Sequence, residues 1–217
     1  MTPGAVIFDC DGVIVDSEYP TFVLLAREFA NYGLILTPDQ IARDFTGGTM
    51  AGVADLARTK GAGLPRDWVP AFYEKLYAHL ALGTALVPGI LDVLDHLDAR
   101  AIPYAVGSNG SDRKMQVTLG QHPGLIERFH GRLFSGQTLG KPKPAPDLYL
   151  HAAAALGVDP ARCVVVEDSP TGAQAARAAA MVCMGYAAAG HEDGLRAAGA
   201  VIFTDMADLP GILGLSL

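Results

Sequence analysis

The sequence predicts an α/β fold, a doubly wound parallel sheet with an inserted α-helical module. Short apolar runs rich in β-branched residues recur along the chain, which is typical of strands covered on both faces. Helical segments alternate with these runs, and this order favours a parallel sheet with crossover helices. One stretch near the N-terminus is helical throughout. With 217 residues, half of them hydrophobic, the chain is long enough for one core domain and a smaller module.

Five short apolar segments are the predicted strands: residues 5–8, 102–108, 163–167, 182–186 and 200–203. Their nearly continuous hydrophobicity indicates burial on both faces. Three predicted helices lie between them, at residues 88–100, 144–156 and 170–180. Each begins at a proline, which is favoured in the first turn of a helix, and Ser169 precedes the third helix as a capping residue. Gly157 follows the second helix, as glycine commonly does at a helix end.

Residues 17–85 break this alternation, because helical segments follow one another there without an intervening strand. The last of these segments carries a large apolar residue at every fourth position: Trp68, Phe72, Leu76 and Leu80. A stripe of this kind indicates packing in a core rather than a ligand-binding face. We therefore expect an inserted helical domain of residues 17–85 and a core domain of residues 1–16 and 86–217.

Composition and charge exclude several classes of protein. The formal net charge is −7 and no basic stripe is visible, which argues against a nucleic-acid partner. No apolar run approaches the ~20 residues needed to cross a bilayer, and the N-terminus lacks the basic segment of a signal peptide. The three cysteines are widely spaced and lie in or beside apolar segments, so we expect buried free thiols: Cys10, Cys163 and Cys183. These features predict a soluble cytoplasmic protein without a membrane partner.

Asp9 and Asp11 stand at the end of the first predicted strand. Two positions apart in an extended chain, their side chains point to the same side. At ~4 Å and an effective dielectric constant of ~20, two carboxylates repel by about 4 kcal/mol, so the pair predicts a counter-ion. Oxygen ligands of this kind are those that Mg²⁺ prefers. Gly12 follows, and glycine can adopt a positive φ that lets the backbone approach a substrate.

Two further polar clusters follow later segments, at the sheet edge where α/β folds bind ligands. In "GSNGS" (107–111), a hydroxyl and several backbone N–H groups suit a phosphoryl oxygen, but a plain turn with Ser111 as helix cap explains the segment equally well. In "GKPKPAPDLY" (140–149), rigid prolines hold a lysine as a point charge for an anion, although exposed lysines before a helix are the simpler interpretation. Lys141 and Lys143 share a side in extended backbone, so the spacing leaves both open.

The fourth cluster is "EDS" (167–169), at the end of the most apolar predicted strand. Adjacent residues on a strand diverge, so only one of the two acids is expected to face a metal ion directly. We predict that Asp168 is the direct ligand and that Glu167 supports it from further out. A pair of helix-capping acids is the alternative interpretation.

Taken in order, the four clusters resemble the motifs of the haloacid dehalogenase (HAD) superfamily of aspartate-nucleophile phosphotransferases. The segment "DCDGVIVDS" is similar to its first motif, and Ser108 in "VGSNG" to its second. The lysine of "KPKPAPD" is similar to its third motif, and "EDS" to its fourth. The helical module resembles the cap of the β-phosphoglucomutase-like branch. The resemblance spans the whole chain and implies a HAD-like, Rossmann-type core.

The resemblance also implies roles for the acids. Asp9 would be the nucleophile that attacks phosphorus and forms an aspartyl-phosphate. Asp11 would be the general acid for the leaving alkoxide and then the base for water. The backbone carbonyl of Asp11 would bind Mg²⁺ together with the carboxylates of Asp9 and Asp168. These roles agree with the preference of Mg²⁺ for oxygen ligands.

The remaining motifs would hold the phosphoryl group. Ser108 and the backbone amide of Asn109 would bind phosphoryl oxygens, and a lysine would balance their charge. In the family this lysine precedes "PAPD", which places it at Lys143, with Lys141 as the competitor. Phosphoryl transfer needs mainly alignment and charge neutralisation, which such a set supplies.

The predicted function is therefore a Mg²⁺-dependent phosphatase that hydrolyses a small phosphate monoester, of the sugar or sugar-acid phosphate class. A phosphomutase of the β-phosphoglucomutase type is the first alternative, and a non-catalytic phosphate-binding protein on the same scaffold is the second. A mutase must grip a distal phosphate, for which a cap arginine is the natural partner. Here Met50 stands where the family mutases carry that arginine, and Tyr19-Pro20 replaces a histidine of theirs. Both departures favour the hydrolase.

Substrate contacts are expected in the cap loop "FTGGTM" (45–50), where Gly47 and Gly48 leave space for a polar sugar phosphate. A hinge or turn explains these glycines equally well. Arg113 and Lys114 follow the second motif, and exposure statistics favour a solvated helix start over contact with a distal anion.

Overall fold

The structure is a computed structural model that describes residues 2–45, 49–188 and 190–215. The chain forms two compact units, one of Met1–Val15 with Ala85–Leu217 and one of Asp16–Thr84. Two short strands, β2 (Val15–Asp16) and β3 (Ala85–Leu86), pair with each other where the chain passes from one unit to the other and back. The crossings lie one residue before the predicted boundaries.

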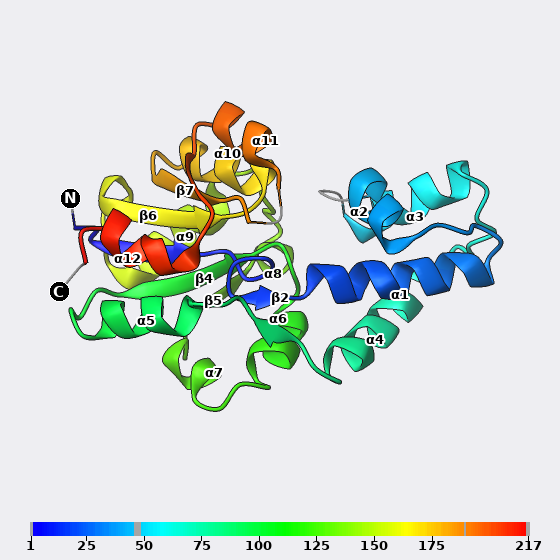
Figure 1. Ribbon diagram of the computed structural model, residues 1–217, viewed down its shortest axis with the longest axis horizontal. Helices are drawn as coiled ribbons and strands as arrows, with labels where there is room; N and C mark the ends of the chain where they lie inside the picture. Colours follow the sequence, from blue (N-terminus) through cyan, green and yellow to red (C-terminus); the bar gives the residue numbers. More distant parts are fainter. Residues whose placement is uncertain (1, 46–48, 189, 216–217) are drawn as a thin grey trace. The chain divides into compact units, whose positions relative to one another are not determined.

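A six-stranded parallel sheet forms the core unit, in the order β5-β4-β1-β6-β7-β8. Its strands are β1 (Ala5–Phe8), β4 (Tyr104–Ser108), β5 (Leu133–Ser135), β6 (Cys163–Glu167), β7 (Val182–Tyr186) and β8 (Val201–Phe203). The chain runs outward from β1 to β5 and returns on the other side of β1 as β6 (Figure 1). The doubly wound parallel sheet is thus confirmed, and its switch in strand order lies beside β1, where ligands bind in such sheets.

Helices connect the strands and cover both faces of the sheet. In the core unit they are α5 (Ile90–Asp98), α6 (Asp112–Leu119), α7 (Leu125–Arg128), α8 (Gly136–Leu139), α9 (Asp147–Leu156), α10 (Pro170–Ala178), α11 (Glu192–Ala197) and α12 (Leu209–Ile212). Two short 3-10 helices, η1 (Pro160–Arg162) and η2 (Met206–Asp208), precede β6 and α12. Among the predicted helices, α5 and α9 begin later than expected because the prolines ahead of them lie in the preceding turns.

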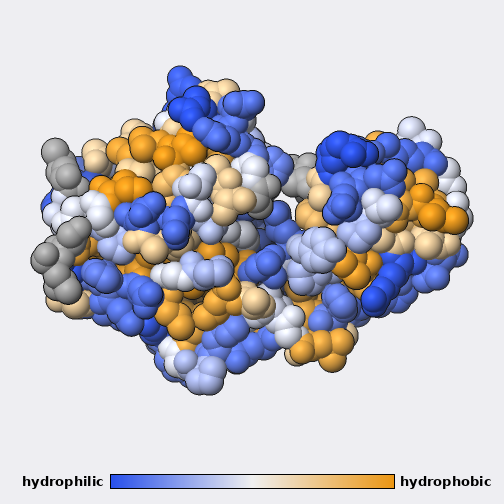
Figure 2. Space-filling view, in the orientation of Figure 1, coloured by the Kyte–Doolittle hydropathy of each residue, from blue (hydrophilic) through white to orange (hydrophobic). Residues whose placement is uncertain are grey.

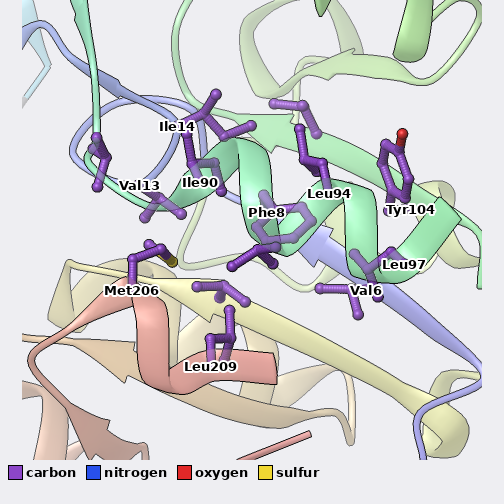
Figure 3. Packing of buried hydrophobic residues seen from close by; sticks show 14 of the residues in the cluster. Val6, Phe8, Val13, Ile14, Ile90, Leu94, Leu97, Tyr104, Met206 and Leu209 are labelled. Atoms are coloured by element: carbon purple, nitrogen blue, oxygen red, sulfur yellow. The ribbon is translucent and has the colours of Figure 1, made fainter. Parts of the chain in front are cut away.

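The side chains of β1 alternate between the two faces of the sheet, so the strand contributes to a hydrophobic layer on each face. Val6 and Phe8 point to one face, where they pack with residues of α5 such as Leu94 (Figure 3). Ala5 and Ile7 point to the opposite face and belong to a second cluster with residues of α9 and α10. Because successive side chains of a strand alternate between faces, a four-residue strand buried on both sides must be apolar at every position.

Sequence patterns did not predict β5, the strand at one edge of the sheet. It has only three residues, and two of them are partly exposed. Parallel pairing with β4 defines it, with Val106 opposite Leu133 and Ser108 opposite Ser135. A segment this short carries no readable period, so contact with β4 decides its conformation.

In the described residues of the second unit there are four helices: α1 (Glu18–Asn31), α2 (Pro38–Phe45), α3 (Met50–Thr59) and α4 (Trp68–Leu80). The predicted stripe on α4 is buried, and the rings of Trp68 and Phe72 stack with centroids 4.6 Å apart. Packing, rather than ligand binding, is therefore its role. Within this unit Lys75 Nζ also lies 2.8 Å from the buried carboxylate of Glu28.

The structure also bears on the expected lack of a membrane-spanning segment and on the expected buried cysteines. In the described part of the chain, no helix combines the length and the apolar character that a membrane crossing requires. Hydrophilic residues are interspersed with apolar ones over the face seen in Figure 2. The three cysteines are buried and free, as predicted.

Candidate active site

Asp9 directly follows β1 and is held between the two neighbouring strands. Its backbone N–H donates to the carbonyl of Val166 in β6 at 2.9 Å. Phe8 pairs with Val106 of β4 and Val166 of β6, which brings Asp9 level with the carboxyl ends of both strands. The residue is only 8% exposed. Sheet register therefore places a nearly buried carboxylate at the switch point.

Lys143 is the cation that neutralises this carboxylate. Its Nζ lies 2.5 Å from Asp9 Oδ1 and 2.5 Å from Glu167 Oε1. Burial opposes the charged form, but the two carboxylates outweigh it and raise the pKa of Lys143 above its ordinary value. Lys141, by contrast, is exposed. Of the two lysines that the sequence left open, the structure places Lys143 beside the predicted nucleophile.

Glu167 is fully buried and accepts three hydrogen bonds from two residues besides Lys143. The Tyr149 hydroxyl donates to Oε1 at 2.7 Å, and the N–H and hydroxyl of Ser169 donate to Oε2 at 3.0 and 2.8 Å. Although burial opposes ionisation, the ammonium group of Lys143 and these hydrogen bonds lower the pKa of Glu167. The Lys143 ammonium group also lies 5.0 Å from the centroid of the Tyr149 ring. Glu167 and Tyr149 thus fix the position of Lys143.

The surroundings of Asp9, including two neighbouring acids, change its pKa. Burial raises the pKa of Asp9 to about 7, with Lys143 opposing the shift and the charges of Glu167 and Asp11 adding to it. The charge of Asp11 thus acts on the pKa of Asp9 in the direction expected from their spacing. The site favours a cation, or a group with positive charge, next to Asp9.

The second motif lies at the carboxyl end of β4 and is tied to the lysine loop. Ser108 is 1% exposed and its Oγ accepts from the backbone N–H of Gly110 at 2.9 Å. The Asn109 side chain accepts from Lys143 N at 2.8 Å and donates to Lys143 O at 3.2 Å. Sequence reasoning missed this second role of Asn109, because the partners lie 34 residues apart and no local pattern links them.

The position of Lys114 differs from the solvated helix start that the sequence favoured. Its Nζ lies 2.8 Å from Asp11 Oδ1, and its side chain is only 17% exposed. The favoured solvated helix start is thus wrong for Lys114, although Arg113 is exposed. Ser111 caps α6 by accepting from the backbone N–H of Lys114 at 3.1 Å, so the cap fixes the backbone of Lys114 in the first turn of α6.

Asp168 and Glu167 have different neighbours: Glu167 lies against Lys143, whereas Asp168 lies against Gly12. A Cβ atom added to Gly12 would lie 1.9 Å from Asp168 Oδ2, which shows that this carboxylate rests against the first motif. Gly12 also has a φ of 76°. Close approach and positive φ both require glycine here. The fold therefore brings the fourth motif onto the first.

Two predicted site residues, Gly47 and Gly48, lie outside the described residues. Among the side chains that the structure describes, no three from His, Cys, Asp and Glu are grouped so as to hold a metal ion. A magnesium site here would therefore use two carboxylates, those of Asp9 and Asp168, with the Asp11 carbonyl. Mg²⁺ commonly binds one or two carboxylates, substrate phosphate and several waters, so this donor set fits.

The chain is similar over most of its length to many known proteins, including the following three. The chain is 30% identical over 215 residues to the 6-phosphogluconate phosphatase of Escherichia coli K12, covering 95% of this chain and 92% of that protein. It is 33% identical over 192 residues to the phosphoglycolate phosphatase of Chromobacterium violaceum, covering 84% and 85%. A HAD family hydrolase from Deinococcus radiodurans R1, crystallised with bound phosphate and sodium, is 34% identical with a TM-score of 0.81, covering 98% and 96%.

The family model of the haloacid dehalogenase-like hydrolases matches residues 3–180. This span contains all four motifs and the complete helical unit. The resemblance of the four motifs is thereby confirmed over most of the chain. The protein belongs to the haloacid dehalogenase-like hydrolase family.

Proposed function

We propose that the protein is a Mg²⁺-dependent phosphatase that hydrolyses a small phosphate monoester of the sugar or sugar-acid class through an aspartyl-phosphate. One observation carries the proposal. A nearly buried Asp9 carboxylate lies at the switch point of the sheet, held 2.5 Å from Lys143 Nζ, with Asp11 two positions further on. The names of the two relatives, phosphatases of 6-phosphogluconate and phosphoglycolate, support the substrate class.

The chemistry divides into two displacements at phosphorus. An Asp9 oxygen attacks, so that a new O–P bond forms while the ester O–P bond breaks, and Asp11 gives a proton to the leaving alkoxide. Asp11 then takes a proton from water, which attacks the aspartyl-phosphate and releases phosphate, restoring Asp9. Lys143, Ser108 and the backbone N–H of Asn109 neutralise and orient the phosphoryl oxygens during both displacements.

Magnesium would be held by the carboxylates of Asp9 and Asp168 and by the backbone carbonyl of Asp11. Bound there, it would neutralise negative charge on the phosphoryl oxygens. The close packing of Asp168 on Gly12 supports this assignment, because it draws the fourth-motif acid to the first motif.

Phosphate release from a panel of sugar, polyol, nucleotide and glycolate phosphates tests the proposal. The protein, stripped of metal and assayed with and without Mg²⁺, is expected to lose at least about 100-fold in rate without the ion, because one bound cation supplies several kcal/mol of charge stabilisation. Readdition of Mg²⁺ should restore the rate. Equal rates in Mg²⁺ and in excess chelator would contradict the metal assignment, and no phosphate release from any ester would contradict the phosphatase.

Gly12→Ala is expected to lower kcat/KM by about 10–100-fold and to raise the Mg²⁺ concentration needed for half-maximal rate, the usual cost of disturbing groups around a metal. The new methyl group would displace Asp168, whose Oδ2 lies 1.9 Å from the added Cβ position. Gly157→Ala is the matched control, since Gly157 has a similar φ of 69° and open space around it. It should cost about 1 kcal/mol of stability and leave the Mg²⁺ requirement unchanged. A similar Mg²⁺ requirement in both variants would argue against Asp168 as a ligand.

A further inference from the structure

We propose that Lys114 determines substrate specificity by binding a second anionic group, a carboxylate or phosphate, on the leaving part of the substrate. The inference rests on the proposed phosphatase function and names the substrate class of the same site. It starts from an ion pair that the roles of the four motifs do not explain: Lys114 Nζ lies 2.8 Å from Asp11 Oδ1.

Lys114 has a fixed place in the site. It lies in the first turn of α6, where its backbone N–H donates to the Ser111 cap at 3.1 Å. The side chain is 17% exposed, so it is not a freely solvated lysine. Holding a long side chain in one place costs rotamer entropy, and the ion pair with Asp11 opposes that cost at this position.

Three side chains meet around the backbone of Gly110. A Cβ atom added there would lie 3.1 Å from Ser108 Oγ, 3.4 Å from Lys114 Cδ and 3.5 Å from Asp11 Oδ2. Ser108 belongs to the proposed phosphoryl-binding motif, and Asp11 is the proposed acid. Lys114 is therefore beside both the phosphoryl position and the group that protonates the leaving oxygen.

The two lysines of the site pair with different acids. Lys143 lies between Asp9 and Glu167, on the side of the nucleophile. Lys114 lies on the side of Asp11, where the leaving alkoxide departs. In this proposal Lys143 binds the phosphoryl oxygens, and Lys114 binds a group on the leaving part of the substrate.

The chemistry of the ammonium group selects its ligand. An ammonium group has three N–H donors and no acceptor, and Asp11 Oδ1 occupies one of these donors. The other donors can bind the oxygens of a carboxylate or phosphate. Such an anion would share Lys114 with Asp11, so that Asp11 can turn toward the leaving oxygen. A polyol phosphate has no second anionic group that could share Lys114 with Asp11 in this way.

Kinetics on matched esters test the inference. We would measure kcat and KM for 6-phosphogluconate, for fructose 1,6-bisphosphate and for glucitol 6-phosphate, which carry a carboxylate, a second phosphate and no second anion. Lys114→Met should lower kcat/KM at least about tenfold more for the two anionic esters than for glucitol 6-phosphate, mainly through KM, because only the anionic esters lose a charge-assisted hydrogen bond. Loss of the ion pair with Asp11 lowers the rate on all three esters alike. Comparison of the first two esters distinguishes a carboxylate from a phosphate as the preferred anion.

Two further variants serve as controls. Lys114→Arg keeps the charge and should retain the preference for anionic esters. Arg113→Met removes the neighbouring, exposed charge and should leave the ratio of kcat/KM values unchanged. Equal losses on anionic and neutral esters in Lys114→Met would overturn the inference while the phosphatase stands. No phosphate release by the wild-type protein from any ester would overturn both.

Discussion

Asp9→Asn is expected to lower the rate of phosphate release by about 10⁴-fold or more, the scale of loss when a nucleophile is removed. The amide oxygen of asparagine does not displace an alkoxide from phosphorus, so no aspartyl-phosphate forms. The shape of the side chain is retained, and Lys143 keeps its contact with Glu167 at 2.5 Å. We therefore expect the midpoint of thermal unfolding to change by less than about 5 °C.

Phosphate release and circular dichroism during heating measure the two effects separately. Asp193→Asn is the matched control, because Asp193 is an exposed acid on α11, and its rate should equal that of the wild-type protein. Acid quenching of the wild-type protein during turnover should also trap phosphate on the chain, and Asp9→Asn should not trap it. Normal turnover by Asp9→Asn would exclude Asp9 as the nucleophile.

Lys143→Met is expected to lose both stability and activity. The change leaves the carboxylates of Asp9 and Glu167 close together without their shared cation, and breaking a buried ion pair from one side costs about 3–5 kcal/mol. The rate should fall about 10³-fold, because a preorganised charge on the phosphoryl oxygens is lost. Urea unfolding and phosphate release under saturating Mg²⁺ check the two effects.

Lys141→Met removes the same charge two positions earlier from an exposed site. Its free energy of unfolding should stay within about 0.5 kcal/mol of the wild-type value, with the rate unchanged. If Lys143→Met is not recovered folded, Lys143→Arg, which keeps a cation between the two acids, still tests the required geometry and should remain folded but slow. Equal rates for the wild-type protein and the Lys143 variants would contradict the role of this lysine.

Much of the fold could be predicted from the sequence because its signals are local. β1, β6 and β7 were predicted with their observed bounds, since strands buried on both faces are apolar at successive positions. β5 was missed, because three partly exposed residues carry no periodic signal and depend on pairing with β4. Helix starts at α5 and α9 shifted for a related reason: a proline indicates a nearby start, and the following turn decides the residue at which the helix begins.

In the candidate site, too, the sequence indicated local features but not contacts between distant segments. The sequence predicts that Glu167 and Asp168 diverge, and in the structure Glu167 lies against Lys143 whereas Asp168 rests against Gly12. The clamp between Asn109 and the backbone of Lys143 had no sequence signal, because it joins two loops 34 residues apart. Lys114 was misread as solvated, because exposure statistics describe an average lysine and carry no information on its distance from Asp11.

The sequence alone determined the strands of the sheet other than β5, the order of the four motifs and the acids at the ends of β1 and β6, because these depend on periodicity and residue type along the chain. Only the tertiary structure decided between Lys141 and Lys143, which share a side in extended backbone. Lys143 is the buried one because its partners, Asp9 at 134 residues' separation and Glu167 at 24, reach it only when β1 and β6 pair in register. A charge becomes stable inside a protein through such distant partners, and strand pairing is what brings them together.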